Sequence, residues 1–175
     1  KKSLPINLQT EEGKEIVDKL VASTDVVIIN ARPDVPEKLG TDYESLSKIN
    51  PRLIYCDNTA FGRRGPRKDS PGYDIVVQAM SGLLAADRKL VDGVPQVMSA
   101  TAVADYATGL SIAWAVSAAL FARERSGVGQ KIDTMLLASA LAVQGGFVDI
   151  ENYGGSERRE FVASLKGLRE SQVPY

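Results

Sequence analysis

The sequence predicts an α/β protein, a Rossmann-like parallel sheet flanked by helices, with one long buried Ala-rich helix. Two short apolar runs, residues 25–30 and 53–56, are rich in β-branched residues, as is typical of parallel strands buried on both faces. Helical patterns separate these runs, and this spacing favours βαβ units with right-handed crossovers. The Ala-rich stretch over residues 101–125 is apolar on all sides, which indicates a helix packed inside a larger protein.

The first part of the chain alternates strand and helix patterns. Residues 4–8 alternate apolar and other side chains, as in a strand. Thr10 is placed as the N-cap of a helix over residues 10–22, which has acids in its first turn and one apolar stripe. Two short helices over residues 34–39 and 42–49 then separate the two buried strands.

The remaining elements follow in the same way. A Gly-, Pro- and Arg-rich segment is expected to be a long loop, and Ser126-Gly-Val-Gly129 is a good stop for the long helix. Apolar density falls after residue 150. In order we expect a loop over 61–72, a helix over 73–86, irregular structure over 87–97, the helix over 101–125, a short strand over 131–133, a helix over 134–143 and a connecting segment over 151–175.

Composition excludes several classes of function. The chain has 175 residues, 44% hydrophobic and 25% charged, which is ordinary for one soluble domain. The net charge of −1 creates no field that would draw the protein to nucleic acid or to an anionic membrane. Ser, Thr, Gly and Asp105 dilute the long helix, which barely reaches the ~20 residues of a membrane span, so we expect no membrane partner.

Cysteine and histidine usage narrows the chemistry further. Cys56 is the single cysteine, so there is no internal disulfide and no Cys-based metal cluster, and this usage fits a reducing cytoplasm. The chain has no histidine, which removes Ser-His-Asp and Cys-His catalysis and His-ligated zinc. We therefore expect no metal site.

The stretch VADYATGL, residues 103–110, places the acid Asp105 at the front of a small, apolar run. One interpretation is structural, because an acid in the first helical turn complements the helix dipole by about 0.3–1 kcal/mol. The other is chemical, because a carboxylate among small neighbours can act as a nucleophile. The residues by themselves leave both interpretations open.

Several blocks occur in a specific order: KKSLPINLQTEEGKEIVDKLVASTDVVIINARPDVPEKLG, INPRLIY, FGRRGPRKDSPGYDIVVQAMSGLLA, DGVPQ, VADYATGL and ARERSGVGQKIDTMLLASAL. With them the chain resembles the family III CoA-transferases of CaiB/BaiF type, which include formyl-CoA transferase, carnitine CoA-transferase and, as a divergent branch, α-methylacyl-CoA racemase. The resemblance covers residues 1–145. It implies that residues 1–150 are the central part of a large domain, that a further segment precedes them, and that residues 151–175 lead toward a smaller domain.

The resemblance implies transfer of coenzyme A from an acyl-CoA donor to a carboxylic acid acceptor. In the motif D-x-x-T/A-G the acid is the nucleophile, which here is Asp105. It would form an anhydride with the acyl group and then a thioester with CoA. CoA is thus a substrate, no tightly bound cofactor is expected, and the partners are an acyl-CoA, a carboxylic acid and, as an intertwined homodimer, a second copy of the protein.

The same resemblance implies a CoA site. Lys38 is the best candidate cation for the CoA phosphates. Gln9 stands at a position where a Lys is common in the family. Arg32 is interpreted equally well as a solvated loop arginine. A further candidate phosphate site is a basic cluster that can equally be a solvated loop, namely Arg63, Arg64, Arg67 and Lys68. The implied positions along CoA and at the active-site border are Ile6, Gln9, Asn30, Arg32, Lys38, Leu39, Tyr73 and Asp74.

Three alternatives accompany this hypothesis. The racemase branch uses a histidine at the position of Tyr73, and a phenol with an ordinary pKa near ~10 replaces it poorly, so racemization is disfavoured. A CoA-binding module without turnover is the second. The third is an unrelated α/β enzyme whose nucleophile is not Asp105.

Overall fold

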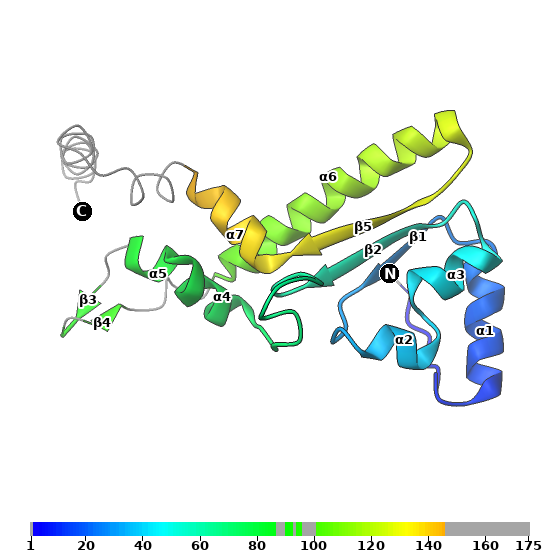
Figure 1. Ribbon diagram of the computed structural model, residues 1–175, viewed down its shortest axis with the longest axis horizontal. Helices are drawn as coiled ribbons and strands as arrows, with labels where there is room; N and C mark the ends of the chain where they lie inside the picture. The colour runs from blue at the N-terminus through cyan, green and yellow to red at the C-terminus, as the bar shows by residue number, and fades with distance from the viewer. Residues whose placement is uncertain (1, 87–89, 93, 96–100, 146–175) are drawn as a thin grey trace. The chain divides into compact units, whose positions relative to one another are not determined.

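A computed structural model describes residues 2–86, 90–92, 94–95 and 101–145. The chain divides into two compact units, Lys1–Ala140 and Leu141–Tyr175, and the first unit holds the sheet and the helices that cover it (Figure 1). Of the second unit only residues 141–145 are described. The connecting segment expected over residues 151–175 lies outside the described residues and stays a prediction.

The first unit is built on a parallel three-stranded sheet. Its strands are β1 (Val26–Ile29), β2 (Ile54–Thr59) and β5 (Gln130–Met135), in the order β1-β2-β5. Val26 pairs with Ile54, and Ile54 pairs with Gln130 on the other side. The predicted α/β class with a parallel sheet flanked by helices is confirmed.

The central strand β2 is longer than its apolar run predicts. It continues through Asp57, Asn58 and Thr59, which are polar yet buried. Each has a partner: Asp57 accepts from Arg63, Asn58 Oδ1 accepts from the Thr134 hydroxyl at 3.1 Å, and Thr59 Oγ1 accepts from the Gly62 amide at 2.9 Å. Because buried polar groups need such partners, this extension depends on side chains supplied by the folded chain.

Three helices cover one face of the sheet: α1 (Glu11–Val21), α2 (Val35–Leu39) and α3 (Tyr43–Ile49) (Figure 1). Thr10 caps α1 as predicted, since its hydroxyl accepts from the Gly13 amide at 3.1 Å. The core on this face is a cluster of apolar side chains from α1, α3, β2 and the residue before it, namely Val21, Leu46, Leu53 and Tyr55.

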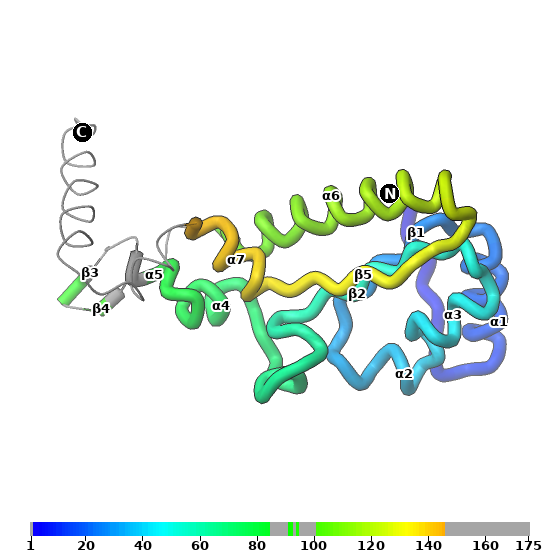
Figure 2. Tube along the Cα trace, turned by 45° about the horizontal axis from the view of Figure 1, so that its top comes forward, coloured from blue at the N-terminus to red at the C-terminus, as the bar shows by residue number. Residues whose placement is uncertain are grey.

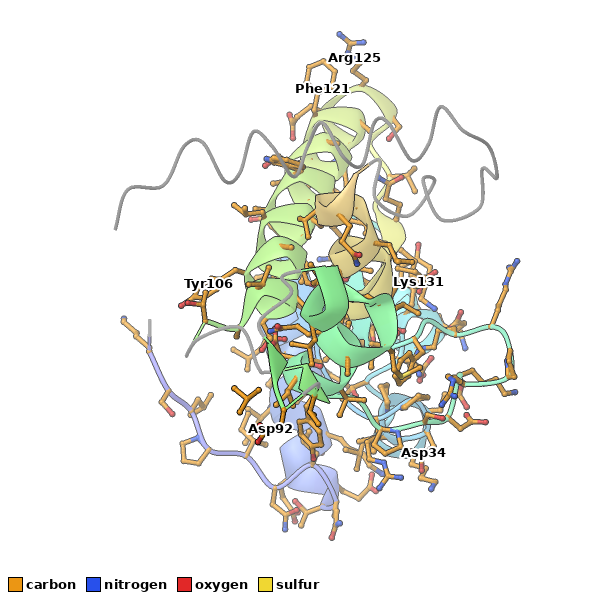
Figure 3. The ribbon with its side chains drawn as sticks, turned by 90° about the vertical axis from the view of Figure 1, so that its left-hand side faces the viewer. Asp34, Asp92, Tyr106, Phe121, Arg125 and Lys131 are labelled. Atoms are coloured by element: carbon orange, nitrogen blue, oxygen red, sulfur yellow. The ribbon has the colours of Figure 1, made fainter. Side chains whose placement is uncertain are left out.

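The long helix α6 (Val103–Ser126) lies over the other face, against β2 and β5 (Figure 2). Only the side that meets the sheet is buried. Trp114 is 73% exposed, and Tyr106 projects away from the helix (Figure 3). The expectation of a helix buried on all sides therefore does not hold within the described residues, because the elements packed against α6 contact only one side of it. The buried residues of α6 are Ala104, Ala107, Thr108, Ala119 and Arg123.

Length and composition alone would allow α6 to cross a membrane, and it is the one such helix among the described residues. Its packing, however, depends on a buried charged residue. Arg123 is buried near its C-terminal end, donates to the Asp25 carboxylate at 2.8 Å and donates to the Arg52 carbonyl at 3.1 Å. Gly127, with a φ of +75°, ends the helix as predicted. The far end of α6 is thus fixed to the starts of β1 and β2.

Two strand expectations need correction. Residues 2–7 form no strand, and Leu4 is 61% exposed, because no neighbouring strand pairs with this segment in the described chain. Burial on both faces holds for β2 but not for β1. Ile28 is 55% exposed on the face that carries α6, since α6 packs mainly against β2 and β5 and leaves this part of the edge strand uncovered.

The helix expected over residues 73–86 is divided. Gly82, with a φ of +84°, separates α4 (Asp74–Ser81) from α5 (Leu83–Ala86). The short antiparallel strands β3 (Leu90–Val91) and β4 (Val94–Pro95) follow, and α7 (Leu136–Gln144) comes directly after β5. A second apolar cluster joins α4, α5, α6 and the start of α7, through Val77, Leu83, Ala104, Leu136 and Ala140.

Candidate active site

Asp105 lies in the first turn of α6, where it is exposed to solvent. The residue before the helix, Ala102, has no side chain that could cap it. Asp74, in the first turn of α4, takes that role: its Oδ2 accepts from the backbone amide of Asp105 at 2.9 Å. Because the first amides of a helix lack intrahelical partners, this bond fixes the turn that carries Asp105.

Asp74 is held in turn by Gln78, one turn further along α4. Gln78 Nε2 donates to the other carboxylate oxygen of Asp74, Oδ1, and also contacts the Thr101 carbonyl at 3.4 Å. The side chain of Gln78 is 1% exposed. A buried amide thus orients the carboxylate that orients Asp105. The sequence analysis missed Gln78; its spacing of four from Asp74 on a helix is the signal that could have found it.

The charge environment of Asp105 is unusual for an exposed acid. Partial burial against the start of α6 raises its pKa above the ordinary value, and the Asp74 carboxylate raises that pKa further. A higher pKa makes the carboxylate more basic and hence a better nucleophile when ionised. The amides at the start of α6 also favour negative charge on groups that approach it.

The surroundings of Asp105 leave room for a ligand. Ala104 and Ala107 fill the inner side of α6 with small groups. Gly109 lies one turn further along on the side of Asp105, and a methyl group placed on it would meet no described atom within 4 Å beyond the helix's own backbone. Tyr73, the residue before α4, is exposed beside Asp74. This side of the carboxylate is therefore open among the described residues.

Of the predicted site residues, Asp74 contacts Asp105 directly, and Tyr73 is its neighbour at the start of α4. The other six lie elsewhere in the first unit, and within the described residues no hydrogen bond or ion pair joins them to Asp105. Ile6 and Gln9 precede α1, Asn30 and Arg32 follow β1, and Lys38 and Leu39 end α2.

The candidate cation Lys38 is engaged locally. Its Nζ lies 2.6 Å from Asp34 Oδ2, one turn before it on α2, and both side chains are exposed. The hydrogen bond from Lys38 lowers the pKa of Asp34. An exposed pair of this kind adds little to stability, so Lys38 can leave it for a phosphate at little cost.

One cation of the basic loop, Arg63, is already held by other residues of the protein. Arg63 Nε donates to Asp57 Oδ2 at 2.6 Å, and a second guanidinium nitrogen donates to the Pro33 carbonyl at 2.6 Å. This hydrogen bond to Asp57 raises the pKa of Arg63. The expected phosphate cluster is thus reduced to Arg64, Arg67 and Lys68, which are exposed.

A cavity of about 410 Å³ lies beside this ion pair, over β2, α2 and α3, and Asp105 is not among its lining residues. Its acids outnumber its bases, which makes it a poor phosphate site. Its charged lining residues are Asp34, Glu37, Asp42, Glu44, Asp57, Asp69, Arg63, Lys68 and Lys131. Within the described ranges no group of three or more Cys, Asp and Glu side chains is placed to hold a metal ion.

Fold and site together define a class: an α/β protein that presents a carboxylate in the first turn of a helix packed across a parallel sheet. The model of CoA-transferase family III matches residues 1–166, so the chain belongs to that family.

Its relatives agree. An acetyl-CoA:oxalate CoA-transferase from Acetobacter aceti is 41% identical over 142 residues, which are 81% of this chain and 36% of the relative. A succinate–glutarate CoA-transferase from Agrobacterium fabrum is 46% identical over 143 residues, 82% of this chain and 35% of the relative. The chain thus spans little more than a third of the length of these relatives.

Solved structures show the same fold. The crystal structure of a CAIB/BAIF family protein from Brucella suis has a TM-score of 0.79 and 40% identity, over 89% of this chain and 41% of that one. The structure of Rv3272 from M. tuberculosis has a TM-score of 0.80 and 35% identity, over 86% of this chain and 41% of that one.

Proposed function

We propose that this chain carries the nucleophile of an acyl-CoA:carboxylate CoA-transferase and that Asp105 is this nucleophile. The observation that carries the proposal is the exposed Asp105 carboxylate, fixed by Asp74 in the first turn of α6. Membership of CoA-transferase family III and the names of the relatives, which are CoA-transferases of small carboxylic acids, support it.

The proposed reaction proceeds through two kinds of covalent intermediate on Asp105, an anhydride and a thioester. An oxygen of Asp105 attacks the thioester carbonyl carbon, the C–S bond breaks, and a mixed anhydride and CoA thiolate form. The thiolate then attacks the Asp105 carbonyl, which releases the donor acid and leaves an enzyme–CoA thioester. The acceptor carboxylate reverses these steps: it displaces thiolate to form a new anhydride, from which the thiolate takes the acyl group and frees Asp105.

Coenzyme A would be bound as a substrate, by its phosphates and by its apolar arm. The candidate contacts remain those expected from the family, with Lys38 and Arg32 as cations near the end of β1 and α2. Tyr73 and Asp74 would border the reacting thioester, because α4 places them at the start of α6. The amides of that helix start would favour the developing oxyanion.

The test is covalent trapping. The full-length protein is incubated with a panel of acyl-CoAs, quenched with hydroxylamine or borohydride, and digested for mass spectrometry. We expect an adduct on Asp105 that disappears in Asp105→Asn, with a fall in transfer rate of at least about a thousandfold. The matched control is Asp18→Asn, an exposed acid on α1, which should keep both adduct and rate. An adduct on another residue would overturn the assignment.

The second candidate is a CoA-binding module without turnover. Its signature is CoA binding in equilibrium dialysis with no trapped adduct. Racemization is the least favoured alternative, because the chain has no histidine; deuterium exchange at the α-carbon of a chiral acyl-CoA would reveal it.

The homodimeric state and the cytoplasmic location belong to the same proposal. The first rests on the family resemblance and the second on the single, buried cysteine. Sedimentation velocity of the full-length protein tests the first, where a monomer at micromolar concentration would contradict it. Fractionation of cells with an antibody to the protein tests the second.

A further inference from the structure

Gln78 is a buried polar residue that the proposed reaction does not use directly. Its Nε2 faces two acceptors, the Asp74 carboxylate and the Thr101 carbonyl, which is two residues before α6. Because both neighbours accept hydrogen bonds, the amide must point its nitrogen toward them. Its Oε1 then faces away and is buried without a hydrogen-bond partner among the described residues.

This arrangement is costly for a side chain that only fills space. A buried acceptor without a partner is unfavourable, and an apolar side chain of the same size would avoid the penalty. The neighbouring Val77 is fully buried and packs in the apolar cluster with Ala104 and Leu136, so α4 has apolar packing without Gln78. The advantage of Gln78 must therefore lie in what its nitrogen holds.

We propose that Gln78 is a positioning residue for the acyl transfer: it clamps the Asp74 carboxylate against the backbone amide of Asp105. This inference rests on the proposed function, because it concerns the reactivity of Asp105. The chain of contacts is continuous, from Gln78 Nε2 to Asp74 Oδ1 and from Asp74 Oδ2 to the Asp105 amide at 2.9 Å. The Thr101 carbonyl ties the same amide nitrogen to the segment that leads into α6.

The clamp also sets the charge that Asp105 faces. Asp74 receives two donors, Gln78 Nε2 and the Asp105 amide, which hold its carboxylate beside Asp105, and this carboxylate adds to the effect of partial burial in raising the pKa of Asp105. Protonation of Asp105 inactivates the nucleophile. Without Gln78, the Asp74 carboxylate can turn away from Asp105, so its contribution to the raised pKa falls and more Asp105 stays ionised as the pH falls.

The experiment compares the variants Gln78→Met, Asp74→Asn and the double variant in the full-length protein. Gln78→Met keeps the length of the side chain and removes the donor. We expect kcat/KM to fall about 10- to 100-fold through misplacement of the first turn of α6. The acidic limb of its pH profile should move to lower pH by about half a unit or more. In the Asp74→Asn background the same change should produce no further shift, because Gln78 acts through Asp74.

Val77→Ala is the matched control, since it weakens the core from the same helix without touching Asp74. It should lower the melting temperature and leave the acidic limb in place. The proposal is overturned if Gln78→Met leaves the acidic limb unmoved. It is also overturned if Gln78→Met shifts the limb by the same amount in the Asp74→Asn background, or if Val77→Ala shifts the limb as much as Gln78→Met does.

A second readout separates this inference from the proposed function. Carbodiimide labels protonated carboxyl groups, and the pH midpoint for labelling of Asp105, read by peptide mass spectrometry, needs no turnover. We expect Gln78→Met to lower this midpoint. A protein that transfers no CoA but shows this shift would refute the proposed function and keep the clamp. A protein that transfers CoA with an unchanged midpoint would refute the clamp and keep the proposed function.

Discussion

At the scale of single residues, Asp105 combines two demands that conflict. Partial burial and the Asp74 carboxylate raise its pKa, which helps a nucleophile but disfavours the ionised form in the folded protein. A raised folded-state pKa contributes stability that is fully present below the ordinary pKa near ~3.9 and is lost as the pH rises through the folded value. The carboxylate thus costs stability at neutral pH.

The variant Asp105→Asn should therefore gain stability relative to the wild type as the pH rises. Between pH ~3 and pH ~7 we expect the difference in the free energy of unfolding to move in favour of the variant, by no more than about 1 kcal/mol because the side chain is exposed. Urea denaturation at both pH values measures it, with Asp18→Asn as control. A difference that moves in favour of the wild type would contradict the sign of the pKa shift.

Gly109 poses a second question at this scale. Glycine within a helix costs roughly 0.5–1 kcal/mol relative to alanine, and no described side chain needs the space that it leaves. Gly109→Ala should raise the free energy of unfolding by that amount. It should also raise the KM for acyl-CoA several-fold, because the methyl group would stand one turn from Asp105 on the side where the thioester approaches.

Thermal denaturation and steady-state kinetics check this prediction. Ser117→Ala, two turns further along α6 and exposed, is the control: it also improves helix propensity and should leave the KM unchanged. An unchanged KM in Gly109→Ala would show that the ligand does not pass along this side of the helix.

At the scale of elements, the position of α6 depends on its two ends. Asp74 fixes the start of the helix, and near the C-terminal end the buried Arg123 donates to the Asp25 carboxylate and to the Arg52 carbonyl. The burial of Arg123 against the starts of β1 and β2 sets the helix across the sheet. Phe121 and Arg125 lie at the same end, where the guanidinium stacks 4.4 Å from the ring centre (Figure 3).

Arg123→Met should destabilise the protein by about 1–3 kcal/mol, because the Arg52 carbonyl loses this donor and the Asp25 carbonyl keeps only the Ile54 amide. The cost stays below that of a fully buried ion pair, since the partner Asp25 is 74% exposed and can be solvated. Asp25→Asn, which removes only the exposed charge, should cost less than about 1 kcal/mol. Denaturant unfolding of both variants tests this order; equal losses would show that the ion pair matters more than the carbonyl contacts.

At the scale of the whole molecule, stability is concentrated on the central strand. Every residue of β2 is buried, and Cys56 on this strand is the single cysteine of the chain. Burial raises the pKa of its thiol, although the Thr134 hydroxyl nearby opposes this. The thiolate that reacts with labelling reagents therefore forms only when the sheet opens.

Labelling of Cys56 by a disulfide reagent such as DTNB should consequently be at least about a thousandfold slower in the native protein than in urea, as expected for global opening. Stopped-flow or manual mixing at pH ~8 measures both rates. The rate should rise with denaturant in parallel with unfolding. Native labelling at the rate of a free thiol would contradict the packing of β2 between α6 and the helices on the opposite face.

The sequence by itself determined the local elements, because these follow from periodicity, caps and turn residues. The helix capped by Thr10, the βαβ order and the Gly127 stop are readable from side chains close together in the chain. The acid Asp105 at the start of a long helix was equally visible. Its motif and the ordered blocks around it also identified the family, since such blocks need no knowledge of contacts.

Only the tertiary structure decided which faces are buried and which polar groups meet. Apolar residues on α6 read alike in sequence, yet Ala104 is buried and Trp114 exposed, because the elements that pack against α6, α4 among them, cover only one side of it. The polar end of β2 and the pair Asp57–Arg63 depend on partners that the fold supplies. The clamp from Gln78 through Asp74 to Asp105 joins residues more than twenty-five positions apart, and no local pattern encodes such a distance.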